Sequence, residues 1–412
     1  MIPLELGVIE PLGRLSARPW AGEVTGVQID SRRIEEGDLF VAAGAGGTDF
    51  VAHALARGAA AALVPDDAHK ALAAIAGTVR DRSSARVVAI TGATGKTTTR
   101  DILAALCSPH ARTVVSEQNY NNELGVPLTL CRIEPDTEIC IAEMGMRGLG
   151  QIAWLASFAR PDLALITNVG PVHLELVETV ENVARAKAEL IEALPPGGIA
   201  VVPEEPLLEP YLTRDDIDIR RFGHVEEPGL YRVGERTISL RTSYSARHQL
   251  DNTLAALVAC DALGLPVEDG ELTVEFTPLR EEELELRDGV LLLNDCYNAN
   301  PMSMRAALEH LAERAGDRRR VAVLGEMAEL GADAAAYHRE IGELASRLDV
   351  AELVAVGQLA REYGSNGVST RWVSTAEEAA DALRELLRPG DVVLVKGSRA
   401  VGLEAVAANL RD

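Results

Sequence analysis

Short apolar runs recur along most of the chain, and a stretch with helical periodicity follows nearly every one. The runs are rich in Val, Ile and Leu and do not alternate with polar residues, which predicts strands buried on both faces. They lie at residues 87–91, 139–143, 163–168, 199–202, 290–295, 321–325, 353–357 and 392–396. Helical patterns lie between the last four, at 302–314, 334–348 and 376–387. Alternating strands and helices predict parallel sheets and an α/β fold.

Two polar stretches divide this pattern into separate sheets. A Glu-rich, irregular stretch runs from Pro266 to Asp288, and a shorter polar stretch from Asp81 to Arg86 precedes the first buried run. We therefore expect three domains, over residues 1–84, 85–279 and 280–412.

The charge balance excludes some partners. The 412 residues carry a formal net charge of −23, and a surface this acidic repels nucleic-acid phosphates and anionic lipid. The five cysteines form no C-x-x-C pair, no apolar run is long enough to span a bilayer, and residues 1–15 lack the pattern of a signal peptide. We expect a cytoplasmic protein that binds neither nucleic acid nor membrane.

The strongest local motif is T-G-A-T-G-K-T-T-T at residues 91–99, which follows a predicted strand and opens a predicted helix. Such a loop binds phosphate through backbone N–H groups and the helix N-terminus. The motif is shorter than the usual G-x-x-x-x-G-K, because position 90 is Ile90. The alternative is a glycine-rich turn with a solvated lysine. The predicted nucleotide-binding residues here are Gly92, Ala93, Thr94, Gly95, Lys96, Thr97 and Thr98.

Three further residues have both a chemical and a structural interpretation. Glu143 ends a strand and suits a magnesium ion, although a carboxylate there could also serve a loop. His173 could ligate a metal or carry a proton, although most lone histidines do neither. Lys187 lies on an apolar helical stripe with Val183 and Leu190. A buried ammonium is costly, so Lys187 either reaches water or is modified to carry negative charge.

Two amide-rich segments complete the candidates. Residues 119–127 contain Asn121 and Asn122, which could recognise a polar substrate or form a turn. Residues 294–301 follow a strand and end in Asn300 and a proline, a typical helix start. That structural role does not account for Asp295 or its neighbours.

Taken together, these motifs resemble those of the Mur ligases. The pieces shared with the family are T-G-A-T-G-K-T-T-T at 91–99, A-E-M-G at 142–145, T-N-V-G at 167–170 with His173, and Lys187. Other pieces resemble the members that use D-alanyl-D-alanine: N-N-E-L-G-V-P at 121–127, D-C-Y-N-A-N-P at 295–301, L-G-E-M at 324–327 and K-G-S-R at 396–399.

The resemblance implies a three-domain architecture with a central phosphate-loop ATPase sheet and a Rossmann-like C-terminal domain. It also implies an activity. ATP phosphorylates the free carboxylate of a UDP-N-acetylmuramoyl-tripeptide, and the amine of D-alanyl-D-alanine attacks the acyl phosphate to form an amide. We expect a monomer that works on these small substrates. The sequence leaves open whether the third peptide residue is diaminopimelate or lysine.

The resemblance also implies roles for individual residues. Lys96 would contact the phosphates, and Thr97, Glu143 and His173 would hold Mg²⁺, with a carbamylated Lys187 nearby. Asn252 would meet the adenine, Asp295 the ribose, and Arg280 the nucleotide after domain closure. The residues expected to bind the muramyl peptide or the dipeptide are Asp30, Ser31, Arg32, Asn121, Asn122, Asn298, Asn300, Lys396, Ser398 and Arg399.

Several positions depart from the family pattern. Gln249 stands where Asn is usual, residues 203–205 are Pro-Glu-Glu where a turn with Asn is usual, and Arg280 lacks the expected preceding glycine. The alternatives are a Mur-type ligase for a single amino acid, which would show a D-N-P-R-like motif that is missing here, and folylpolyglutamate synthase. A different class, an ATP-binding regulatory protein without catalysis, also stays open.

Overall fold

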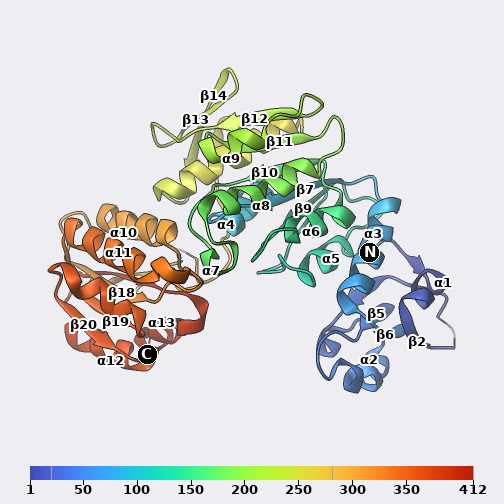
Figure 1. Cartoon of the computed structure of the whole chain (residues 1–412), viewed down its shortest axis with the longest axis horizontal. Coiled ribbons are helices and arrows are strands. Elements are labelled where there is room, and N and C mark those ends of the chain that lie inside the picture. The colour runs from blue at the N-terminus through green and yellow to red at the C-terminus, as the bar shows by residue number, and fades with distance from the viewer. Residues whose placement is uncertain (20, 281, 412) are drawn as a thin grey trace.

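The chain forms three groups of elements in a row, as Figure 1 shows, with the central group between the other two. A computed structural model describes residues 1–19, 21–280 and 282–411. Within those residues, five β-sheets carry the strands, and none of the helices is long and apolar enough to cross a membrane.

The first group is a four-stranded sheet with strand order β2-β6-β5-β4 and a small two-stranded sheet beside it. In the larger sheet β2 runs antiparallel to β6, and the other pairs are parallel. The strands are β1 (Leu4–Glu5), β2 (Gly13–Ala17), β3 (Glu23–Val24), β4 (Gly26–Gln28), β5 (Asp38–Val41) and β6 (Ala61–Pro65). The helices are α1 (Leu6–Ile9), α2 (Val51–Arg57) and α3 (Ala68–Arg82).

The central group is built on a six-stranded parallel sheet with strand order β12-β11-β10-β7-β9-β8. Its strands are β7 (Arg86–Thr91), β8 (Thr113–Val115), β9 (Ile139–Glu143), β10 (Leu163–Ile166), β11 (Ile199–Pro203) and β12 (Asp218–Phe222). A smaller sheet holds β13 (Leu230–Val233), β14 (Arg236–Thr242) and β15 (Gly270–Leu272). The helices are α4 (Lys96–Cys107), α5 (Gly125–Leu130), α6 (Gln151–Ala159), α7 (Leu174–Val177), α8 (Val180–Glu192) and α9 (Arg247–Ala262).

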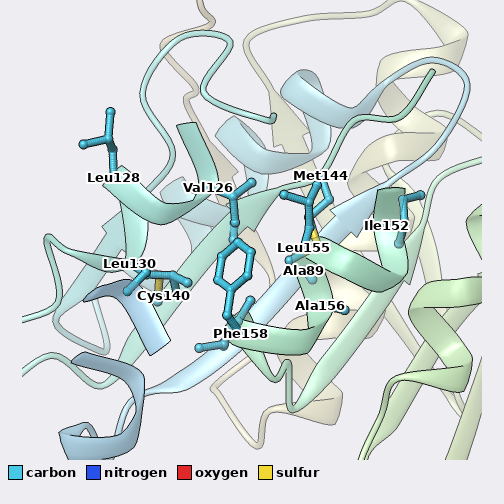
Figure 2. Packing of buried hydrophobic residues seen from close by; sticks show 14 of the residues in the cluster. Ala89, Val126, Leu128, Leu130, Cys140, Met144, Ile152, Leu155, Ala156 and Phe158 are labelled. Atoms are coloured by element: carbon cyan, nitrogen blue, oxygen red, sulfur yellow. The ribbon is translucent and has the colours of Figure 1, made fainter. Parts of the chain in front are cut away.

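The central sheet is buried on both faces, as its uninterrupted apolar strands predict. Residues of α4 and α9 form one core with one face of the sheet, and residues of α5, α6 and α8 form another core with the opposite face. Figure 2 shows part of this second core, where Phe158 of α6 lies among Val126, Leu155 and neighbouring side chains. Helix α3 of the first group shares the same core.

The C-terminal group is a six-stranded sheet with strand order β16-β17-β21-β18-β19-β20, in which only the edge pair β16–β17 is antiparallel among the described pairs. The strands are β16 (Glu282–Glu285), β17 (Leu291–Asn294), β18 (Arg320–Gly325), β19 (Val350–Val356), β20 (Thr370–Val373) and β21 (Val392–Lys396). The helices are α10 (Pro301–Ala315), α11 (Ala334–Arg347), α12 (Ala376–Leu386) and α13 (Glu404–Arg411).

The predicted buried strands all occur, but three of them end before the predicted residue, at Ile166, Asn294 and Val356. The run 163–168 forms a strand only as far as Ile166, because the next two side chains turn toward the phosphate loop. The short strands of the first sheet and β12–β15 were not predicted from apolar runs. Sheet membership changes between β6 and β7 and again between β15 and β16, close to the boundaries expected at residues 84 and 280.

Arg80 on α3 links the first group to the central sheet. Its guanidinium donates hydrogen bonds to the carbonyl oxygens of Ala85, Ala159 and Arg160, and it pairs with the Asp162 carboxylate at 2.8 Å. The same carboxylate accepts a hydrogen bond from the Val87 N–H at the start of β7. The Arg80 side chain is 12% exposed, so these bonds are largely shielded from water.

We expect Arg80→Ala to destabilise the chain by about 2–4 kcal/mol, because it removes the guanidinium donor from three carbonyl oxygens and the charged partner from Asp162. The measurement is thermal unfolding followed by circular dichroism, where the melting temperature falls by several degrees. Arg241→Ala is the matched control, since the Arg241–Glu271 pair is 80% and 67% exposed and such pairs contribute little. Equal effects of the two substitutions would contradict this prediction.

Candidate active site

A cleft of about 1410 Å³ lies where the central and C-terminal groups meet. The loops after β7, β9 and β10 line it from the central sheet, and the loops after β17 and β21 line it from the C-terminal sheet. Both sheets are mainly parallel, and ligands bind at the carboxyl ends of strands in such sheets. Most of the residues predicted for the nucleotide and metal line this cleft.

The phosphate loop connects β7 to α4 by a tight turn. Gly95 precedes the helix with φ +74°, and a side chain there would lie 2.6 Å from the Asn252 amide oxygen of α9. The Lys96 ammonium donates a hydrogen bond to the Gly92 carbonyl at 2.9 Å. Burial lowers the pKa of Lys96, with the Arg280 charge acting in the same direction and Glu143 opposing it. The phosphate loop, Lys96 and Asn252 therefore line the same part of the cleft.

Asn168 at the end of β10 holds the phosphate loop in place. Its amide oxygen accepts hydrogen bonds from the Ala93 and Thr94 N–H groups at 3.1 and 2.9 Å. Its amide nitrogen donates to the Thr94 hydroxyl at 2.8 Å, and Thr167 donates to the Thr94 carbonyl at 2.6 Å. These contacts fix the backbone of the phosphate loop against the residues that follow β10. Asn168 was not predicted as a site residue, although its place at a strand end signalled it.

Glu143 is the buried carboxylate of the site, with 1% of its side chain exposed. It accepts hydrogen bonds from the Thr97 hydroxyl and the Asn121 amide, both at 2.8 Å. The Arg100 guanidinium lies 3.6 Å away. Asn121 therefore orients Glu143 in this structure, and Asn122 caps the turn before α5 through the N–H groups of residues 124 and 125.

Oxygen atoms of Thr97 and Glu143 fit a magnesium ion. Among the residues described, no three His, Cys, Asp or Glu side chains form a metal cluster. The hydroxyl and carboxylate oxygens of Thr97 and Glu143 suit Mg²⁺, which is commonly held by one or two carboxylates together with substrate phosphates rather than by a full protein cage.

His173 contacts the C-terminal group instead of Glu143. Its Nδ1 is hydrogen-bonded to the Glu329 carboxylate, which also pairs with Arg147 at 3.3 Å. Burial lowers the pKa of His173, while the Glu329 hydrogen bond and charge oppose that shift. The short segment after His173 also bonds to the same loop, through the Glu175 N–H and the Glu329 carbonyl at 3.2 Å.

Lys187 lies on the inner face of α8 with 1% of its surface exposed, and it borders the cleft. Burial is the main cause that lowers its pKa well below the ordinary lysine value, and the charge of Lys96 adds to the shift. A lysine with this environment is neutral more readily than an exposed one, and a neutral amine is a nucleophile.

The C-terminal residues line the cleft, but several already have partners. Lys396 pairs with Asp295 at 2.5 Å and donates to the Asn298 carbonyl at 3.1 Å. Ser398 accepts a hydrogen bond from the Ala328 N–H. Asn300 caps α10 through Ser303, and its amide also reaches the Ala93 carbonyl of the phosphate loop at 3.5 Å. Arg399 is exposed and pairs with Glu404.

The predicted N-terminal residues lie outside this cleft. Asp30 pairs with Arg32 at 2.7 Å, which lowers the pKa of Asp30 to about 2, and the Ser31 hydroxyl is hydrogen-bonded to His53. The next residue, Arg33, reaches the central group, where it contacts Glu117 and Tyr120 at 2.9 and 3.0 Å. A ligand bound at Asp30–Arg32 would therefore lie on the side of the chain that leads toward Asn121.

Sequence reasoning missed four residues that shape the site: Arg100, Asn168, Tyr297 and Glu329. Asn168 and Tyr297 stand inside quoted motifs at strand ends, so their position was an available signal. Glu329 lies in a loop after β18, and Arg100 lies one turn after the start of the phosphate-loop helix α4. Neither residue has a local pattern that could have indicated its partner.

Two family models match the chain: the Mur ligase middle domain over residues 90–260 and the Mur ligase glutamate ligase domain over residues 280–399. Among curated proteins, a UDP-N-acetylmuramoyl-tripeptide–D-alanyl-D-alanine ligase of Synechocystis is 34% identical, with 94% of this chain and 92% of the relative covered. The protein of that name from Mycobacterium tuberculosis strain H37Rv is 36% identical, with 93% and 92% covered.

The solved structures that resemble this chain include members of the same family. MurF from Acinetobacter baumannii superposes with a TM-score of 0.86 at 26% identity, covering 99% of both chains. MurF from Thermotoga maritima in complex with ADP gives 0.80 at 27% identity, covering 94% of this chain and 97% of that one. Folylpolyglutamate synthase from M. tuberculosis gives 0.65 at 17% identity, covering 84% and 95%, which shows a shared fold alone. By sequence and by architecture, this chain belongs to the Mur ligase family.

Proposed function

We propose that the chain is an ATP-dependent ligase that joins D-alanyl-D-alanine to the C-terminal carboxylate of UDP-N-acetylmuramoyl-tripeptide. The products are UDP-N-acetylmuramoyl-pentapeptide, which is a peptidoglycan precursor, ADP and phosphate. The observation that carries the proposal is the cleft in which a phosphate loop, a buried carboxylate and the C-terminal Asn300 and Glu329 meet. Relatives with this activity in their names match more than nine-tenths of the chain.

In the first step, the tripeptide carboxylate attacks the γ-phosphorus of ATP, an acyl phosphate forms and ADP leaves. Lys96 and the N–H groups at the start of α4 neutralise charge on the phosphates, as loops of this kind do. Asn252 packs against the loop from α9 and meets the adenine side. Asp295 borders the ribose, held in position by its pair with Lys396.

Thr97 and Glu143 would hold a magnesium ion at the phosphates. His173, which contacts Glu329 of the C-terminal group, would help to hold a second magnesium ion. Magnesium, when bound, neutralises the charge that develops on the transferred phosphoryl group. Asn121 keeps one Glu143 oxygen in place by donating to it. The contribution of the chain itself is to orient these oxygen atoms in a buried site.

In the second step, the neutral amine of D-alanyl-D-alanine attacks the acyl carbon. The C–N bond forms through a tetrahedral intermediate, the C–O bond to phosphate breaks, and the amine proton passes to solvent. Asn298 and Arg399 line the cleft on the side of the incoming dipeptide. Lys396 and Ser398 act behind them, since both are buried and hydrogen-bonded within the C-terminal loops.

The UDP end of the substrate would bind at Asp30, Ser31 and Arg32 in the first group. Arg33 joins that region to the segment that holds Asn121 and Asn122, so the muramyl peptide would extend along this contact toward the phosphate loop. We further propose that the enzyme acts as a monomer in the cytoplasm, where its nucleotide substrates are available.

Two other functions would use the same nucleotide site, and a substrate-dependent assay distinguishes them from this one. A Mur-type ligase for a single amino acid would use the same phosphate loop, and a regulatory ATP-binding protein would bind nucleotide without forming a bond. The buried charges that a binding protein would not need, Glu143 and Lys187 beside Lys96, favour a catalytic site. Relatives named for D-alanyl-D-alanine favour the dipeptide.

We expect phosphate release from ATP and magnesium to require both UDP-N-acetylmuramoyl-tripeptide and D-alanyl-D-alanine. Mass spectrometry should show a product heavier by one dehydrated dipeptide. Lys96→Met should lower kcat by about 1000-fold or more, because it removes a positive charge from the transferring phosphoryl group. Release with a single amino acid on a shorter precursor would reassign the substrate, and no release with any pair would favour the binding protein.

We also propose that Lys187 is carbamylated. Its neutral amine would attack carbon dioxide, a C–N bond would form and one proton would leave to solvent. The resulting anion would balance the positive charge of Lys96, the nearby group that lowers the pKa of Lys187.

The expected result is a carbamate carbon signal in ¹³C NMR when the wild type is supplied with ¹³C-bicarbonate at pH 8. The signal should weaken as the pH falls, because protonation of the amine reverses the addition. Lys187→Met should lose the signal while keeping the apolar packing of α8. Lys70→Met, which changes a lysine that is 80% exposed, should retain it. An unchanged signal in Lys187→Met would refute the modification.

A further inference from the structure

Arg100 is a buried charged residue that the proposed mechanism leaves unused. It lies on α4, one turn after Lys96, and only 3% of its side chain is exposed. Its Nη1 donates to the Gln118 carbonyl at 2.6 Å, and its Nε and Nη2 donate to Asp101 at 2.9 and 2.6 Å. A buried guanidinium is tolerated when its donors are paired in this way. The Arg100 guanidinium is therefore held in place, and one of its hydrogen bonds reaches a residue from another part of the chain.

That hydrogen-bond partner is Thr277, which is distant in sequence. The Thr277 hydroxyl accepts a hydrogen bond from Arg100 Nη2 at 2.6 Å and donates one to Asp101 Oδ2 at 3.0 Å. The Thr277 N–H donates to the same carboxylate oxygen at 2.9 Å. A threonine hydroxyl has one donor and two acceptor positions, so this side chain is held by both members of the Arg100–Asp101 pair.

Thr277 lies midway along the connection between the central and C-terminal sheets. The last strand before it, β15, ends at Leu272, and β16 begins at Glu282. Leu279 in this connection has φ +65°, a left-handed conformation that costs a non-glycine residue about 1–2 kcal/mol and persists where surrounding contacts hold it. Its carbonyl accepts a hydrogen bond from the Tyr297 N–H at 3.2 Å.

The connection delivers Arg280 to the nucleotide site. The Arg280 guanidinium lies 4.1 Å from the centre of the Tyr297 ring, borders the cleft and is close enough to Lys96 to lower its pKa. Only Pro278 and Leu279 lie between Thr277 and Arg280, so the anchoring of Thr277 limits where Arg280 can lie. The segment is held at one end by Arg100 and Asp101 and at the other by Tyr297.

We propose that Arg100 and Asp101 are positioning residues that anchor Thr277 and thereby set Arg280 beside Lys96. The kinetic part of this inference rests on the proposed ligase function, whereas the anchoring itself does not. Arg100 also lies 3.6 Å from Glu143. One guanidinium therefore connects the carboxylate of the candidate magnesium site to the segment that carries Arg280.

The test uses Thr277→Val, which removes the hydroxyl while keeping the size of the side chain and the N–H bond to Asp101. Thr277→Ser keeps the hydroxyl and serves as the conservative variant. Thr273→Val is the matched control, because Thr273 is exposed on the same segment. Hydrogen exchange of the amides of Leu279 and Arg280, binding of a non-hydrolysable ATP analogue and kcat are measured for all four proteins.

In Thr277→Val we expect faster exchange at residues 279 and 280 and a kcat about 10-fold lower, because a small misplacement of a charge-stabilising group is costly to rate. Affinity for the ATP analogue should stay within about 2-fold, since the phosphate loop is untouched. Thr277→Ser and Thr273→Val should both behave like the wild type.

Unchanged exchange in Thr277→Val would overturn the anchoring. So would equal losses in Thr277→Val and Thr277→Ser, because the hydroxyl would then be irrelevant. A fall in analogue affinity as large as the fall in kcat would overturn the positioning of Arg280 specifically. If the wild type forms no amide bond, the proposed function fails, and the exchange measurement alone still decides whether Arg100 and Asp101 hold the segment.

Discussion

The site depends on charged side chains that are withdrawn from water at the carboxyl edge of the central sheet. Arg100, Glu143 and Lys187 are almost fully buried there, with Lys96 beside them. Charges in such places must be paired or neutralised. Glu143 is satisfied by Thr97 and Asn121, and Arg100 is satisfied by Asp101 and Thr277. In a chain of net charge −23, Lys96 and the N–H groups at the start of α4 are what suit this part of the cleft to a polyphosphate.

The second constraint is that the site is shared between two sheets. Asn300 reaches the phosphate loop and Glu329 reaches His173, while Arg280 arrives on the connecting segment. Ligation needs a nucleotide and two further substrates to meet, so a cleft between separately folded sheets suits the task. The contact of Arg100 and Asp101 with Thr277 gives that connection a fixed point on the phosphate-loop helix.

The positions of most strands in the two six-stranded sheets could be predicted, because a strand buried on both faces leaves an uninterrupted apolar run. The runs at 87–91 and 139–143 became β7 and β9 with little change in their bounds. The first sheet escaped prediction because its strands are short and one face is partly exposed. The run at 163–168 was read too long, since apolar length cannot show that Thr167 and Asn168 serve the phosphate loop.

For the site, the sequence by itself determined the phosphate loop, Glu143 at a strand end and a lysine on an apolar stripe, because each is a local pattern within a few residues. Only the tertiary structure decided the partners: His173 with Glu329, Lys396 with Asp295, and Arg100 with Thr277. These pairs join residues from about 100 to 177 positions apart. Spacing along a chain carries no information about such contacts, which arise when separate sheets and helices pack together.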